Sequence, residues 1–216
     1  LVSKRESYDD WRDSAWLLRF DSDGRVCWSR TYDASVSFID GAYAPDASTF
    51  LLAGKLNGTA GVESPAGVIA IENGGIAWRR TYPANWFWDI APAFDDSSEA
   101  IAVGHVSRDD RDDVGVVARL GAQGGVHWWR TLSSDRGSII CNNVRPTSQG
   151  YLITGRIRRS ERGDVQFFGT LDPDGSRCQC YTLDQPQGAQ LLLTADQLLS
   201  VDEVGDGAVL RSLGRR

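Results

Sequence analysis

Two acidic residues stand on similar apolar segments, and their surroundings suggest sugar chemistry. Asp40 lies in VSFIDGAYA and Asp89 lies in NWFWDIAPA, where Trp86 and Trp88 are close to the carboxylate in sequence. Aromatic faces can stack on a sugar ring while carboxylates bind its hydroxyl groups. Two carboxylates ~5–9.5 Å apart could also hydrolyse a glycosidic bond, one as acid and one as base. The segment therefore indicates a glycan site or a carbohydrate-active enzyme.

Polar residues also interrupt the corresponding apolar segments SIICNNVRP (138–146) and AQLLLT (189–194). We expect these polar positions to converge on a central axis. The candidate ligand-binding residues are Asp40, Trp86, Trp88, Asp89, Asn142, Asn143 and Gln190. The structural alternative is that the two carboxylates accept backbone hydrogen bonds and that the two indoles fill gaps between elements.

Other motifs point to chemistry less specifically. The acidic loop SRDDRDD (107–113) and the turns DSDG and DPDG could bind calcium, although none has EF-hand spacing. No other cofactor is implied. His105 and His127 are isolated from other metal ligands in sequence, which favours surface or seam positions. No Ser-His-Asp order, phosphate-binding loop or dinucleotide fingerprint is present, so no catalytic residue is assigned.

The four cysteines match no zinc pattern. Cys178 and Cys180 are two residues apart on a predicted strand, so they share a face and a bond between them is awkward. Free thiols are therefore favoured over a disulfide.

Composition excludes several partners. The chain has 216 residues and a formal net charge of −6, with acidic and basic residues interspersed. Without a basic stripe, nucleic acid is not an expected partner. No apolar run reaches the ~18–20 residues that a membrane-spanning helix requires.

A repeat of 50 residues organises the chain. Trp28, Trp78 and Trp128 lie in the phrases GRVCWSRTY, GGIAWRRTY and GGVHWWRTL, and an arginine follows two residues after each. Each unit contains four short segments rich in Val, Ile, Leu, Trp and Tyr, bounded by Gly, Asp, Asn, Ser and Pro. Four antiparallel strands per 45–50 residues make one propeller blade. The sequence predicts an all-β propeller forming a single domain over 1–216.

Within a blade, we expect the segment that carries Asp40 or Asp89 to be innermost and the Trp strand to be outermost. The repeated indoles then pack between neighbouring blades. Arg30, Arg80 and Arg130 lie on the same side of the strand and stack or cap the seam.

The chain ends fall inside a unit, so closure must be inferred. The favoured arrangement has four blades, in which the N-terminal strands 15–20 and 26–32 join the C-terminal strands in 187–202. Segment 208–213 is then an extra edge strand. The alternatives are five blades, two of them incomplete, or a fragment of a larger propeller.

The phrase DSAWLLRFDSDGRVCWSRTY (13–32), followed by TFLLAG (49–54), resembles the repeat of bacterial and archaeal secreted or surface β-propeller proteins. That repeat reads close to D-x-W-L-V-K-L-D-x-D-G-x-V-x-W-x-x-T-Y. The match covers nearly the whole chain and departs from the pattern in the fourth unit, where Gln179 replaces Trp. The resemblance implies a propeller in a secreted, periplasmic or cell-surface setting, and it carries no catalytic residues.

These observations favour a non-enzymatic binding or scaffold module with a protein or glycan partner. One alternative is a glycoside hydrolase or lyase that uses Asp40 and Asp89 as axial carboxylates. The other is a fragment of a larger repeat-containing surface protein.

Overall fold

The computed structural model describes residues 2–4, 14–33, 36–43, 49–56, 65–96, 98–108, 111–159, 163–183, 190–193, 197–204 and 207–215. In this part of the chain the regular structure is entirely β-strand. The described residues accordingly include no helix long and apolar enough to cross a membrane.

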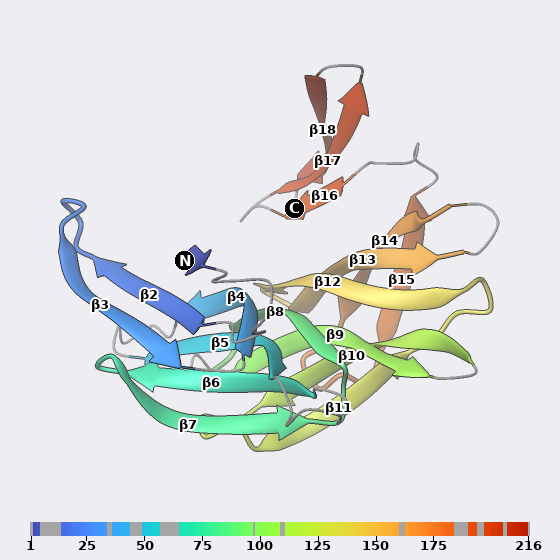
Figure 1. The fold of residues 1–216 in the computed structure, drawn as a ribbon. Helices are drawn as coiled ribbons and strands as arrows, with labels where there is room; N and C mark the ends of the chain where they lie inside the picture. Colours follow the sequence, from blue (N-terminus) through green and yellow to red (C-terminus); the bar gives the residue numbers. More distant parts are fainter. Residues whose placement is uncertain are drawn as a thin grey trace, which may run out of the picture.

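The strands form five sheets, in each of which chain neighbours pair antiparallel (Figure 1). Sheet 1 contains β1 (Val2–Lys4), β2 (Ser14–Phe20) and β3 (Val26–Asp33). Sheet 2 contains β4 (Val36–Tyr43), β5 (Thr49–Leu56), β6 (Ala66–Glu72) and β7 (Gly75–Tyr82). Sheet 3 contains β8 (Trp86–Pro92), β9 (Ala100–Arg108), β10 (Arg111–Leu120) and β11 (Val126–Leu132). Sheet 4 contains β12 (Ser138–Thr147), β13 (Gly150–Arg158), β14 (Val165–Leu171) and β15 (Cys178–Leu183). Sheet 5 contains β16 (Gln190–Leu193), β17 (Gln197–Val204) and β18 (Gly207–Arg215).

The predicted all-β class and the four-strand unit are confirmed. Sheets 2, 3 and 4 each run through the four predicted segments in order, and the N-terminal β1 occupies the place of a second strand. The first strands of sheets 2, 3 and 4 lie near one another, since β8 lies against both β4 and β12. Figure 1 shows the sheets following one another around the molecule in chain order.

The pairing at the chain ends differs from the expected four-blade closure. Strand β2 is bonded to β1 and β3, while β17 is bonded to β16 and β18. Segment 208–213 thus belongs to β18, the third strand of sheet 5, which pairs with β17 at the edge of that sheet. Loop closure gives the reason: β1 and β18 lie near their partners in sequence, so pairing with them costs less chain entropy than joining the two ends of the chain.

The hydrophobic core lies in layers between successive sheets. Val68 and Ala70 of β6 pack with Val116 and Ala118 of β10, so one face of sheet 2 meets sheet 3. The other face of β6 packs on sheet 1, where Leu17 is buried. This arrangement follows from the strand period of two, which sends alternate side chains to opposite faces. Both faces of the middle sheets are therefore apolar.

The fourth strands are exposed, yet their repeated side chains reach across to the next sheet. In β7, donors at alternate positions project toward the hairpin loop between β10 and β11. They donate to three consecutive backbone carbonyls of that loop. The pairs are Trp78 Nε1 with Ala122 (3.0 Å), Arg80 Nε with Gln123 (2.6 Å) and the Tyr82 hydroxyl with Gly124 (2.9 Å).

The seams on either side repeat parts of this contact. The Tyr32 hydroxyl donates to the oxygen of Gly74 at 2.7 Å, and Arg130 Nε donates to the oxygen of Gly175 at 2.8 Å. Trp128 lies against Gly175, which has a positive φ of 70°. The prediction that the repeated Trp and Arg side chains lie at the seams is confirmed for these contacts. We call the Trp, Arg and Tyr positions of the fourth strand the seam set.

Candidate functional site

A β-bulge recurs at the same place in the first strand of sheets 2, 3 and 4. The pairing register shifts just before Asp40, Asp89 and Asn143, which are therefore equivalent residues. A bulge re-aims the side chain that it carries, so the repeat brings one polar residue per unit to this position. The backbone of Asp40 pairs with Ala53, and its side chain lies outside the described ones.

Asp89 links the first strands of sheets 3 and 4. Its side chain is 1% exposed. Oδ1 accepts a hydrogen bond from the Ile90 backbone at 2.8 Å, and Oδ2 accepts one from the Val144 backbone at 2.8 Å. Arg145 Nη1 donates to the same Oδ2 at 2.6 Å. Both carboxylate oxygens are engaged by protein groups, which a buried carboxylate requires.

Trp86 and Trp88 belong to a stacked column. Their rings lie 5.1 Å apart at an interplanar angle of 16°. Lys55 Nζ lies 5.5 Å from the centroid of Trp86, and the His105 ring lies 6.0 Å from that of Trp88. Each indole thus contacts two neighbours in the column. A sugar approaching it would meet indole edges more readily than a free face.

His105 fixes the orientation of Trp88. Trp88 Nε1 donates to His105 Nδ1 at 2.9 Å, which requires an unprotonated Nδ1. Burial lowers the pKa of His105, Asp113 opposes this effect, and the nearby cations Arg158, Arg156 and Lys55 lower it further. The neutral imidazole is therefore favoured, as the Trp88 bond requires.

The amide candidates lie elsewhere. Asn143 Nδ2 reaches Thr154 Oγ1 at 3.4 Å within sheet 4, and Asn142 is half-buried beside it. Gln190 begins β16 and pairs with Val201, and its side chain lies outside the described ones. The described candidates thus divide into a stacked column, a buried carboxylate and an amide within one sheet.

One repeated position next to the column carries a basic residue type in each of sheets 2, 3 and 4, a pattern that the sequence did not bring out as a set. Lys55, His105 and Arg156 each follow the glycine of a second strand. The signal was present in the sequence as Gly-Lys, Gly-His and Gly-Arg at equivalent places of the repeat. The role of Arg145 had no such signal, because its partner Asp89 is 56 residues away in another sheet.

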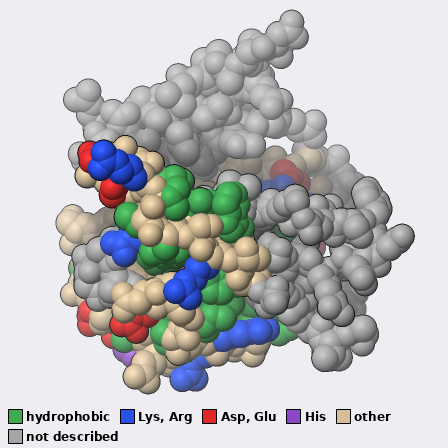
Figure 2. All heavy atoms as spheres, turned by 60° about the vertical axis from the view of Figure 1, so that its left-hand side comes forward, with side chains coloured by type: hydrophobic (Ala, Val, Ile, Leu, Met, Phe, Trp, Pro, Cys, Tyr) green, Lys and Arg blue, Asp and Glu red, His purple; other side chains and the backbone are tan. Residues whose placement is uncertain are grey.

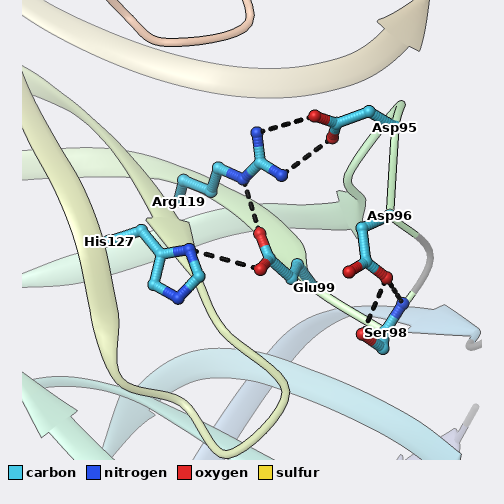
Figure 3. Close-up of polar contacts among 6 residues, drawn as sticks. All are labelled: Asp95, Asp96, Ser98, Glu99, Arg119 and His127. Carbon is cyan, nitrogen blue, oxygen red and sulfur yellow. Dashed lines mark hydrogen bonds and ion pairs between the residues drawn. The ribbon is translucent and has the colours of Figure 1, made fainter.

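An ion-pair cluster occupies the opposite end of sheet 3 (Figure 3). The guanidinium of Arg119 forms two bonds to Asp95, at 2.8 and 3.2 Å, and Nε donates to Glu99 at 2.6 Å. His127 Nδ1 lies 3.3 Å from the other Glu99 oxygen. Burial lowers the pKa of Arg119, but the hydrogen bonds to Glu99 and Asp95 outweigh it and raise the pKa overall.

This cluster braces the loop between β8 and β9. A Glu-His pair could act as a general base if a nucleophile were within reach. The hydroxyl of Ser98, the serine in this close-up, donates to Asp96 at 2.7 Å and lies apart from His127, beyond Glu99 (Figure 3). The charged side chains at this end of sheet 3 are therefore paired with one another.

The described residues contain no group of three or more His, Cys, Asp or Glu side chains that could hold a metal ion. Calcium binding by the acidic loop stays a prediction, since residues 109 and 110 lie outside the described part. All four cysteines are free thiols, with Cys141 buried and Cys27 exposed.

Neither a family model nor a curated protein sequence matches the chain.

Proposed function

We propose that the chain is a non-enzymatic β-propeller module that binds a protein or glycan partner, as a binding or scaffold protein. The observation that carries this proposal is the engagement of Asp89, whose carboxylate is buried between two sheets and bound by Val144 and Arg145. The residue best suited to acid–base chemistry from its sequence context is thus occupied in holding the molecule together.

The layered packing supports the propeller. Sheets 2 and 3 are apolar on both faces and their first strands lie close together, while their fourth strands are exposed. Such wedge-like sheets are what blades around an axis require. The separate pairing of sheets 1 and 5 supports five blades, the alternative to the four-blade closure.

Loops held on a rigid set of sheets suit a binding protein better than an enzyme. The seam set fixes the hairpin loops of sheets 2, 3 and 4 to the sheet before each of them through backbone carbonyls. Loops held by a rigid scaffold are where binding residues usually lie. The resemblance to secreted and surface propellers favours an extracellular, periplasmic or cell-surface partner.

The test compares binding with hydrolysis on the same preparation. The whole chain is applied to a glycan array and used to capture proteins, and a polysaccharide panel is assayed for released reducing ends. We expect saturable binding without release. Release that is lost in an Asp89→Asn variant that remains folded, and kept in Asp135→Asn, a change at an exposed turn residue, would instead establish the hydrolase.

A further inference from the structure

The repeat breaks in the fourth strand of sheet 4, and a pocket lies at the break. Gln179, Tyr181 and Leu183 stand where the other units have the seam set Trp, Arg and Tyr or Leu. Gln179 pairs with Thr170 just as Trp128 pairs with Arg119 in sheet 3. The replacement of an indole by a short amide leaves less side-chain volume at this position. A pocket of about 280 Å³ lies here.

The pocket is lined mostly by polar side chains. They come from the turn after β12 and from β14, β15 and the loop between them: Thr147, Gln149, Thr170, Asp172, Arg177 and Gln179. The volume is close to the lower end of the range for small-molecule sites, ~300 Å³. It fits a ligand the size of one sugar ring better than a peptide segment.

Most of this polar lining has no partner in the protein. The side chains of Gln149, Thr170, Asp172 and Arg177 make no hydrogen bond or ion pair with another described residue. In sheet 3 the residue equivalent to Thr170 is Arg119, whose donors are satisfied by Asp95 and Glu99. At this position sheet 4 thus presents donors and acceptors without a partner among the described residues, whereas the equivalent donors of sheet 3 are hydrogen-bonded.

An exposed aromatic ring is hydrogen-bonded to Gln179, one of the residues that line the pocket. Tyr181 is 52% exposed and stacks on Phe168 at 5.2 Å. Its hydroxyl donates to Gln179 Oε1 at 3.3 Å, which connects the ring to the pocket wall. A half-exposed ring beside hydroxyl, amide, carboxylate and guanidinium groups is the combination that binds a sugar, since the ring contacts its apolar C–H face.

The charges of the lining favour a neutral ligand. Asp172 carries a negative charge and Arg177 a positive one, so a charged ligand would be attracted by one of them and repelled by the other. Adjacent hydroxyl groups can both donate and accept, and therefore match the pair. We propose that this pocket binds a neutral sugar residue, a terminal or branch unit of a glycan. This inference rests on the proposed function as a binding module and assigns it a site.

The decisive variant is Gln179→Trp, because three other units carry Trp at this position and the indole would fill the pocket. The probes are free neutral monosaccharides and their methyl glycosides, with a uronic acid as charged comparison, measured by saturation-transfer NMR. We expect saturable binding of a neutral sugar to the wild type and a loss of at least tenfold in affinity in Gln179→Trp. Asp172→Asn, which keeps the shape of the pocket, should also weaken binding.

Arg79→Ala serves as the control, since Arg79 is an exposed side chain on the fourth strand of another sheet. It should bind like the wild type. If a sugar binds equally to Gln179→Trp and Asp172→Asn, the pocket is wrong while the binding module stands. Preference for the uronic acid overturns the neutral class. If the wild type binds no sugar, this inference fails together with the glycan form of the module, and protein capture tests the remaining form.

Discussion

The hydroxyl group of Tyr82 shows how a single side chain joins two sheets of this molecule. Its ring is buried, and its hydroxyl donates to the oxygen of Gly124 in the next hairpin loop. A buried carbonyl that loses its donor keeps its desolvation cost. The repeated tyrosine is therefore a structural residue, although its pattern alone could have belonged to a ligand site.

Replacing Tyr82 by Phe should lower the free energy of unfolding by about 1–2 kcal/mol, measured by urea denaturation at pH 7. Tyr181→Phe is the matched control and should change it by less than about 0.5 kcal/mol, because Tyr181 is half exposed. Equal effects of the two substitutions would show that the Gly124 contact contributes nothing.

The same residue predicts an alkaline transition. Burial, opposed by the nearby Arg80, raises the pKa of Tyr82 to about 12. A pKa raised on folding means that the folded state holds its proton more tightly. This contribution to stability is fully present below the unfolded pKa of ~10 and is lost as pH rises toward 12. We expect the free energy of unfolding to fall over this interval more steeply in the wild type than in Tyr82→Phe.

The two neighbouring thiols of β15 give a prediction about reactivity. Cys178 Sγ lies 3.3 Å from Cys180 Sγ. The hydrogen bond between them lowers the pKa of Cys180 to about 7, against the effect of burial, and raises the pKa of Cys178. Since the thiolate is the nucleophile, alkylation of Cys180 by iodoacetamide should rise with an inflection near pH 7.

Mass spectrometry of each cysteine over a pH series would check this. In Cys178→Ala the inflection at Cys180 should move upward, because the hydrogen bond is gone. Cys141 should stay unmodified in the native state, since it is fully buried. An unchanged inflection in Cys178→Ala would contradict the proposed cause.

At the scale of the element, the hairpin loop between the third and fourth strands is the repeated contact between one sheet and the next. Gly24 and Gly124 occupy equivalent loops and share a left-handed φ of 79° and 73°. A Cβ at Gly124 would lie 2.7 Å from the Trp78 ring and 2.8 Å from Arg80 Cδ, whereas at Gly24 it would meet nothing within 4 Å. The two loops share the same backbone conformation at this glycine, but only the loop at Gly124 has side chains of another sheet packed against it.

Substitution of both glycines by alanine should separate strain from packing. Both variants lose roughly 1–2 kcal/mol because alanine disfavours the left-handed region. Gly124→Ala should lose about 1–3 kcal/mol more, because the seam must open to admit the methyl group. Urea denaturation of the two variants measures the difference in their free energies of unfolding. Equal losses would mean that the seam opens for the methyl group without an energetic cost.

The sequence predicted the elements well because the strand signal is local and repeated. It placed the seam contacts because Trp and Arg recur in register on one face. It did not predict that Asp89 is bound by Arg145, since partners in different sheets leave no local trace. The pocket beside Gln179 was also beyond sequence reasoning, although the break in the repeat marked its strand. The reason is that a cavity arises where the side chains of several elements leave space between them, which no single stretch of sequence shows.

At the scale of the whole molecule, sheet 1 has one face without the cover that its equivalents have. Phe20 is 55% exposed, while the equivalent Ile71, Leu120 and Leu171 are 2% exposed or less. Trp16, on the same face, is 36% exposed. Figure 2 shows hydrophobic side chains grouped with Lys and Arg on the side of the molecule where β2 and β3 lie. The series of seams starts at this face.

Serine substitutions at equivalent positions would report whether this face is covered in solution. Leu120→Ser should lower the free energy of unfolding by about 2–5 kcal/mol, because it empties a filled site between sheets. Phe20→Ser should lower it by less than about 1 kcal/mol, since much of the ring already contacts solvent. A cost at Phe20 that approaches the cost at Leu120 would show that a neighbouring sheet packs on sheet 1. The pair of urea midpoints thus tests whether the ring of blades closes on sheet 1.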